Sequence, residues 1–156
     1  MLHGRFFYYL CVKDIETMTH NFKLSEFLTW PYRLRNMSQE DRVKATNEML
    51  GYITHYDIEE AQRIAAYLQD IRDDFSDTFG DTPFFITCWL RSPAWERYRR
   101  RDGSSQHTQG HAVDFVPAKW EKVHRDWMKE RLKDWDGGFG MYSWGVHLDL
   151  GTKRRF

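Results

Sequence analysis

Hydrophobic side chains in the middle of the chain recur with the spacing of an α-helix. Between Asp57 and Phe75 the apolar residues fall on one helical face, at Ile58, Ala61, Ile64, Ala65, Leu68, Ile71 and Phe75. Asp57 and Glu60 have the spacing of a capping box, with Asp in place of the usual Ser or Thr. We therefore predict an amphipathic helix over residues 57–75. Weaker patterns predict helices over about 39–50 and 118–132.

Shorter apolar runs, bounded by Gly and Pro, are typical of strands and dominate the rest of the chain. We expect strands at 84–90, 111–116, 139–143 and 146–150, and a further strand within residues 1–17. Because helices come early and strands later, the sequence predicts an α+β fold with a mainly antiparallel sheet packed with helices. A length of 156 residues suits one domain with a single core.

The charge composition argues against some classes of binding partner. The formal net charge is +0 at pH 7, so no overall field attracts nucleic acid or an anionic membrane. Arginines cluster locally at positions 97 and 99–101. We interpret this cluster first as a solvated helix face and second as a contact to an anionic polymer. Nucleic-acid binding through the cluster is therefore a weak alternative function.

Two features bear on where the protein is made. The apolar run over residues 6–12 is far shorter than the roughly 20 residues of a membrane span, and no small-residue cleavage site follows it. We expect a protein that has no membrane span and no secretory signal peptide and is made in the cytoplasm. Cys11 and Cys88 are too few for a disulfide scaffold, and we expect them to be reduced, buried thiols.

Candidate chemistry lies at polar positions inside the predicted strands. His147 and Asp149 alternate with apolar residues, so they share one face of a strand. Asp114 interrupts another apolar strand, which is costly unless the carboxylate is paired or binds a metal. With His107 from the preceding loop, two imidazoles and one carboxylate make a catalytic zinc set that keeps a position open for water. On spacing alone, ordinary hydrogen-bonded polar residues near a sheet edge remain the alternative.

The local sequence around these residues resembles a known family. Residues 105–114 read Ser-Gln-His-Thr-Gln-Gly-His-Ala-Val-Asp, which resembles the Ser-x-His-x-x-Gly-x-Ala-x-Asp signature of the zinc D-alanyl-D-alanine carboxypeptidases. Residues 86–93 resemble that family's strand ending in Arg-Ser-Pro, and residues 138–149 its Gly-x-Gly-x-Tyr and His-x-Asp segments. Residues 21–27 resemble the opening of the branch common in tailed-phage proteins. The resemblance implies the hedgehog/D-Ala-D-Ala zinc peptidase fold.

The resemblance also implies roles for individual residues. It implies that Zn²⁺ is bound by His107, Asp114 and His147. Arg91 would bind a carboxylate or carbonyl of the substrate through its planar guanidinium, with a structural ion pair as the alternative. Ser105 would hold the loop or touch the substrate, and Tyr142 is a further substrate-binding candidate. A tight backbone turn between two ligands is expected at Gly110.

Three positions depart from the family's pattern. Many relatives have Glu or Asp as the general base three residues before the final His, where this chain has Trp144. Asp149 is then either the base or an acceptor that orients an imidazole, and both readings stay open. Trp95 and Glu96 replace the usual Asn after Arg-Ser-Pro, which leaves the peptide preference open. Cys88 stands where Ser is common, and we interpret it as a core residue.

The expected function is hydrolysis of peptidoglycan stem peptide by a zinc peptidase domain over residues 20–156. The enzyme would be a D,D-carboxypeptidase, or an endopeptidase that cuts L-Ala-D-Glu or D-Ala-meso-diaminopimelate bonds. We expect a monomer that acts on the cell wall in the host periplasm during phage lysis. The main alternative is a zinc-containing cell-wall-binding or virion module without turnover. Residues 1–19 would be an extension or an edge strand, and translation starting at Met18 would remove most of them.

Overall fold

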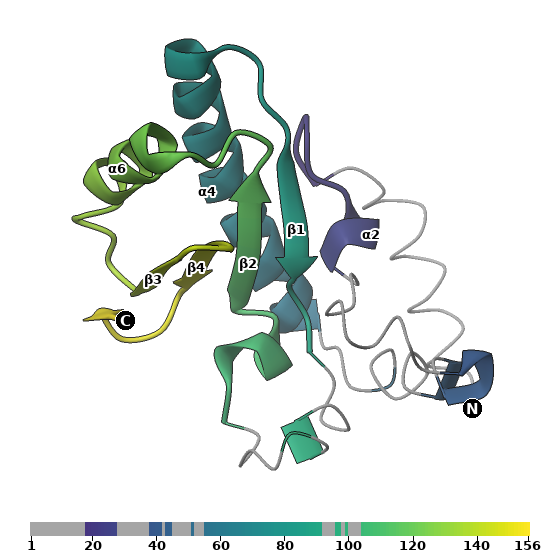
Figure 1. Cartoon of the computed structure of the whole chain (residues 1–156). Helices are drawn as coiled ribbons and strands as arrows, with labels where there is room; N and C mark the ends of the chain where they lie inside the picture. Colours follow the sequence, from purple (N-terminus) through teal and green to yellow (C-terminus); the bar gives the residue numbers. More distant parts are fainter. Residues whose placement is uncertain are drawn as a thin grey trace.

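The computed structural model describes residues 18–27, 38–41, 43, 44, 51, 55–91, 96, 97, 99 and 104–156 of the chain. Within these residues a five-stranded sheet has the strand order β1-β2-β4-β3-β5. The long helix α4 lies across one face of this sheet, and α6 lies beside α4 (Figure 1). The elements in chain order are α2 (Leu24–Phe27), α4 (His55–Phe79), β1 (Phe84–Cys88), η2 (Gln106–Gln109), β2 (Ala112–Pro117), α6 (Lys122–Arg131), β3 (Gly138–Tyr142), β4 (Gly145–Asp149) and β5 (Arg154–Arg155).

Helix α4 confirms the helix that the strongest hydrophobic pattern predicted. All seven apolar positions expected on one face are buried and belong to the core. The helix begins at His55, so Asp57 lies in its first turn and not at the predicted capping position. There the Asp57 carboxylate is buried, 3.7 Å from Nε2 of His111 in the loop before β2. This contact joins the start of the helix to the loop that leads into the sheet.

The sheet is antiparallel except at one edge. β1 with β2, β2 with β4, and β3 with β4 all pair antiparallel, whereas β5 pairs parallel to β3. The predicted α+β class with a mainly antiparallel sheet is therefore confirmed. The short strand β5 was not predicted. The four expected strands in residues 84–150 are present, with ends that differ from the prediction by one or two residues.

A β-bulge changes the register at the end of β1. Ile86 pairs with Phe115, but the next pair joins Cys88 to Asp114, so Thr87 is the extra residue. Bulges often re-aim side chains next to functional sites. Here the bulge places Cys88 opposite the acidic residue of β2.

Residues ahead of α4 contribute to the same core. Phe22 and Phe27 are buried, and the main-chain N–H of Leu90 donates to the carbonyl oxygen of Phe27 at 3.0 Å. Gln69 on α4 accepts from the main-chain N–H of Asn21 at 2.9 Å. The segment 18–27 is thus fastened both to α4 and to the end of β1.

Some expectations fall wholly or partly outside the described residues. The strand expected within residues 1–17 and most of the helix expected over 39–50 lie there, although residues 39–41, 43 and 44 are helical. In the arginine cluster, Arg97 and Arg99 are exposed, and positions 100 and 101 are outside the description. Among the helices of the described part, none has both the length and the apolar character needed to cross a bilayer.

Candidate metal centre

Three adjacent elements bring the expected zinc ligands together. Asp114 on β2 pairs directly with His147 on β4, so the two side chains project from the same face of the sheet. His107 comes from η2, which ends at Gly110 with φ 72°, a left-handed conformation that suits glycine. A Cβ at Gly110 would also lie 2.8 Å from the ring of Phe27. The tight turn expected between two ligands is therefore present.

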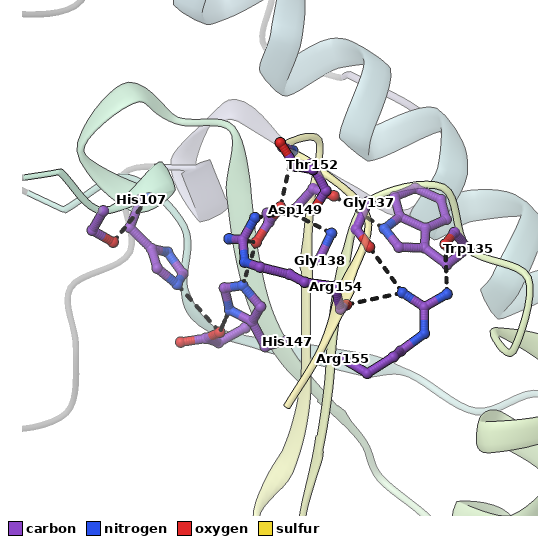
Figure 2. A network of polar contacts seen from close by, with 12 residues as sticks. His107, Trp135, Gly137, Gly138, His147, Asp149, Thr152, Arg154 and Arg155 are labelled. Carbon is purple, nitrogen blue, oxygen red and sulfur yellow. Dashed lines mark hydrogen bonds and ion pairs between the residues drawn. The ribbon is translucent and has the colours of Figure 1, made fainter.

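The carboxylate of Asp114 lies between the two imidazoles. Its Oδ1 is 3.3 Å from Nε2 of His107 and 2.8 Å from Nδ1 of His147. The two rings are 5.2 Å apart between centroids. Figure 2 draws both contacts as dashed lines, with the rings of His107 and His147 on either side of the shared oxygen atom. Two nitrogen donors and one carboxylate thus converge on one point, as the sequence predicted for these three residues.

Hydrogen bonds behind the rings fix which nitrogen faces Asp114. Nδ1 of His107 lies 2.9 Å from the carbonyl oxygen of Trp89, and Nε2 of His147 lies 2.9 Å from Oδ2 of Asp149. Carbonyl and carboxylate oxygens only accept, so these two nitrogens carry the protons. Nε2 of His107 and Nδ1 of His147 face Asp114; they donate to its carboxylate when protonated, and once deprotonated they would offer their lone pairs to a metal ion. Such backing hydrogen bonds are what orient metal-binding histidines.

Asp149 is buried and its carboxylate is fully engaged. Oδ1 accepts from the main-chain N–H of Gly138 at 3.0 Å and of Gly151 at 2.9 Å. Oδ2 accepts from His147 and from Nη2 of Arg154 at 2.6 Å. Burial favours the neutral acid, but the hydrogen bond from His147 and the other donors outweigh burial and lower the pKa of Asp149. Placed behind His147 and held by four donors, Asp149 is better suited to orienting the imidazole than to taking a proton from water.

The centre strongly attracts positive charge. Burial by itself would lower the pKa of His107, but the negative charges of Cys88 and Asp114 outweigh it and raise that pKa to about 10. Burial also opposes protonation of His147, yet hydrogen bonds to Asp114 and Asp149 raise its pKa. Both imidazoles therefore sit in a field that favours a cation between them, whether a proton or a metal ion.

Cys88 adds a donor atom that the sequence analysis did not place here. It is buried, as a core residue should be, but its Sγ lies 3.7 Å from Nδ1 of His107. One donor atom each from Cys88, His107 and Asp114 lie within 4.8 Å of one another, close enough to hold a metal ion. The sulfur faces the nitrogen of His107 that is bonded to Trp89, whereas Asp114 faces the other nitrogen. A metal ion held by His107, Asp114 and His147 would therefore meet the nitrogen of His107 that does not bond to Trp89. An ion placed next to Cys88 would face the nitrogen that does.

Arg91 lines the site and is also paired. Its Nη1 lies 3.0 Å from Oε1 of Glu96, whose side chain is 1% exposed. Its Nη2 lies 3.8 Å from Sγ of Cys88 and 3.9 Å from Oδ2 of Asp114. The structural ion pair considered from the sequence is thus present. Glu96, which stands in a segment where relatives have Asn, is the residue that forms it.

A pocket of about 490 Å³ opens over the three expected ligands. Ser105 caps η2 by accepting from the main-chain N–H of His107 at 3.3 Å, which is the loop-holding role expected for it. The rings of Tyr142 and Trp144 stack at 4.9 Å and are partly exposed at the pocket wall. The full lining comprises Arg91, Ser104, Ser105, Gln106, His107, Asp114, Tyr142, Trp144, His147, Asp149, Arg154 and Phe156.

Five lining residues were not site candidates in the sequence analysis: Ser104, Gln106, Trp144, Arg154 and Phe156. Of these, Arg154 and Phe156 lie beyond the last of the motifs. They follow β4 in a short polar stretch that has no strand periodicity to mark it. Among the described lining residues the only side-chain carboxylates are those of Asp114 and Asp149. Trp144 holds the position that relatives fill with a base, and its exposed ring offers no proton acceptor.

Most of the chain matches one family of known proteins. The family model described as Peptidase M15 matches residues 34–149, a span that includes His107, Asp114 and His147. No curated protein and no solved structure matches the chain significantly. The α+β architecture fits the hedgehog/D-Ala-D-Ala peptidase type of fold implied by the sequence motifs. The chain therefore belongs to the peptidase M15 family, whose members are zinc-dependent peptidases.

Proposed function

We propose that the protein is a zinc peptidase that hydrolyses stem-peptide bonds of bacterial peptidoglycan. The observation that carries the proposal is the convergence of His107, Asp114 and His147 at the base of a 490 Å³ pocket in a chain of the M15 family. A pocket of this size accommodates a few residues of an extended peptide. The substrate class comes from the resemblance of residues 105–114 and 138–149 to cell-wall peptidases.

The donor set fits zinc. Tetrahedral zinc with bonds of 2.0–2.2 Å needs N and O donors about 3.3 Å apart. Asp114 Oδ1 lies 3.3 and 2.8 Å from the two imidazole nitrogens, so these two donor separations are close to the value that zinc needs. Two His and one carboxylate leave a position for water, as catalytic sites do. Zinc at this position supplies a Lewis acid that polarises the scissile carbonyl and makes water more acidic.

The protein's own residues prepare this centre. The carbonyl of Trp89 and the carboxylate of Asp149 hold the two imidazoles with the metal-binding nitrogens facing Asp114. In this proposal Asp149 orients His147 and is not the general base. Tyr142 and Trp144 form a wall of the pocket against which the peptide lies. Arg91, which lies near Asp114, contacts a carbonyl oxygen of the substrate.

The pairing of the arginines favours an endopeptidase over a carboxypeptidase. A carboxypeptidase must bind a terminal carboxylate, usually through an available guanidinium. Arg91 is paired with Glu96, and Arg154, the other arginine of the described pocket lining, is paired with Asp149. Both positive charges are thus already compensated. We propose cleavage within the stem peptide, at an L-Ala-D-Glu or D-Ala-meso-diaminopimelate bond.

The proposed setting is lysis of a phage-infected or prophage-bearing cell. Its support is the resemblance of residues 21–27 to a branch common in tailed-phage proteins. The protein would be made in the cytoplasm and act as a monomer on the cell wall in the periplasm.

A zinc-containing module without turnover is the second candidate. The observation in its favour is Trp144 at the position of the usual base, with no uncommitted side-chain carboxylate among the described pocket-lining residues. Such a module would bind the cell wall or serve in a virion. It predicts zinc binding and attachment to cell-wall sacculi without the release of peptide.

Digestion of purified sacculi separates the two candidates. Mass spectrometry of the soluble products should show new peptide termini with wild-type protein, and none after zinc is removed by a chelator. His147→Ala should abolish both zinc binding and cleavage. His20→Ala, at an exposed histidine far along the chain from the ligands, is the matched control and should retain both. Stable binding to sacculi with full zinc and no product would refute the peptidase and support the module.

A further inference from the structure

The residues that follow β4 fold back onto the metal centre. Arg154 donates its main-chain N–H to the carbonyl oxygen of Gly137 at 3.2 Å, and Phe156 donates to that of Phe139 at 3.1 Å. These bonds fix β5 parallel to β3. Arg154 and Phe156 both line the pocket, whereas Arg155 between them donates to carbonyl oxygens of residues 133–137. Both pocket-lining residues lie beyond the span matched by the family model.

Arg154 shares an acceptor atom with His147. Its Nη2 lies 2.6 Å from Oδ2 of Asp149, the same oxygen that accepts from Nε2 of His147 at 2.9 Å. The other oxygen of Asp149 is held by two main-chain N–H groups. Figure 2 shows the side chain of Arg154 reaching across to Asp149, next to His147. Arg154 is therefore the one charged group bonded to the carboxylate that backs His147, within the described residues.

Phe156 bounds the same imidazole from another side. Its ring meets the ring of His147 edge to face, with centroids 5.5 Å apart and an interplanar angle of 84°. The guanidinium of Arg154 lies 5.2 Å from the centre of the Phe156 ring. The two side chains thus pack on each other while each contacts the His147–Asp149 pair. This packing restricts rotation of both Asp149 and His147.

We propose that Arg154 is a positioning residue of the metal centre, which holds Asp149 so that Asp149 holds His147 with Nδ1 toward Asp114. The inference rests on the proposed zinc site and extends it to a residue outside the ligand motifs. A simple surface ion pair would be the alternative, since the Arg154 side chain is 39% exposed. Its partner, however, is 0% exposed, so removing Arg154 leaves a buried carboxylate with one donor fewer. Oδ2 of Asp149 would then be held by His147 alone, so the orientation of the pair would be less well fixed.

A double-mutant cycle on the full chain tests whether Arg154 acts through Asp149. Zinc affinity is measured by competition with a chromophoric chelator, and thermal denaturation checks that each variant is folded. Asp149→Asn should weaken zinc binding by roughly 10–100-fold, as loss of a backing acceptor does. Arg154→Ala should weaken it by about tenfold, and the double variant should match Asp149→Asn within about twofold. Fully additive losses would overturn the proposal, because Arg154 would then act independently of Asp149.

Arg155→Ala is the matched control for a merely structural arginine. Arg155 donates to the carbonyl oxygens of residues 133, 135, 137 and 154, and its side chain is not among the described residues that line the pocket. Its loss should lower the melting temperature but leave the zinc dissociation constant within about twofold of wild type. Arg154→Lys, which keeps a charge near Asp149, should recover part of the affinity lost in Arg154→Ala. Unchanged zinc affinity in Arg154→Ala, or an equal loss in Arg155→Ala, would overturn the positioning role.

Wild-type behaviour separates this inference from the function on which it rests. Wild-type protein that binds no zinc refutes the proposed function and this inference together. Wild-type protein that binds zinc while Arg154→Ala binds it equally well refutes only the role of Arg154. In the active enzyme the positioning role further predicts that Arg154→Ala lowers kcat more than it raises KM, since Arg154 acts on the metal ligand.

Discussion

Gly138 offers a way to disturb the metal centre without touching any residue that contacts metal or substrate. It lies on β3 with its main-chain N–H bonded to Asp149. A Cβ added there would lie 2.2 Å from Oδ2 and 2.6 Å from Oδ1 of Asp149. A carbon–oxygen contact needs a little over 3 Å, so in Gly138→Ala the carboxylate must move by about 1 Å. A shift of that size takes the bonds to His147 and Arg154 towards or beyond hydrogen-bonding range.

Two consequences follow for the Gly138→Ala variant. Overpacking of this kind costs about 1–3 kcal/mol of unfolding free energy, and each kcal/mol lowers the melting temperature by about 2–4 °C for a chain of this size. Zinc affinity should fall by roughly 10–100-fold, because His147 loses its backing acceptor. The assays are thermal denaturation with a chelator present and a competition titration for zinc.

Gly51→Ala is the matched control for this substitution. Gly51 is helical and exposed, and a Cβ there meets nothing within 4 Å. The control should keep wild-type zinc affinity and gain up to about 1 kcal/mol from better helix propensity. Wild-type zinc affinity in a folded Gly138→Ala protein would refute the reasoning, since His147 would then be oriented without a fixed Asp149.

Three further outcomes are expected. Arg91→Lys should retain zinc but lower turnover on sacculi, because Lys cannot hold Glu96 and a substrate oxygen with one planar fork; unchanged kinetics would reduce Arg91 to its ion pair. In chelator-treated protein, the raised pKa of His107, about 10 against 6.5, stabilises the fold below pH 6.5, and this contribution is lost as the pH rises through 10. Melting temperatures that stay flat over that range would contradict the stabilisation of protonated His107 by Cys88 and Asp114. A protein starting at Met18 should keep zinc binding and activity, and a folded, zinc-loaded but inactive product would show that residues 1–17 shape the site.

Hydrophobic periodicity alone was enough to predict the elements that have many apolar positions. The seven buried residues of α4 repeat over five turns, so tertiary context had little room to alter the prediction. Asp57 was misplaced because the capping pattern marks a start by spacing, whereas the helix continues back to His55 and Asp57 contacts His111. Strand β5 has two residues and its pairing depends on β3, so no local pattern identifies it.

The candidate site was only partly visible in the sequence. His107, Asp114 and His147 were identified by alternation and motif, and the structure brings all three together. The proximity of Cys88 depends on the bulge between Ile86 and Cys88, which has no signature in the residues themselves. Spacing could not distinguish the two hypotheses for Asp149, because a general base and an acceptor that orients the imidazole would both lie on the strand face of His147. The donor atoms of Gly138, Gly151 and Arg154, which bear on this choice, are brought to Asp149 only by the folded structure.

The contact between Phe27 and Gly110 bears on how this domain should be excised for study. The ring of Phe27 lies against the turn after His107 and meets the ring of Trp89 at 5.7 Å, while Trp89 supplies the carbonyl that orients His107. A fragment cut to the span matched by the family model would begin at residue 34 and lose this ring. The ligand loop would then rest on a cavity, and large-to-small changes of this kind at a buried Phe cost about 3–5 kcal/mol. A recombinant fragment that is to keep its metal therefore needs to include the whole segment 18–27.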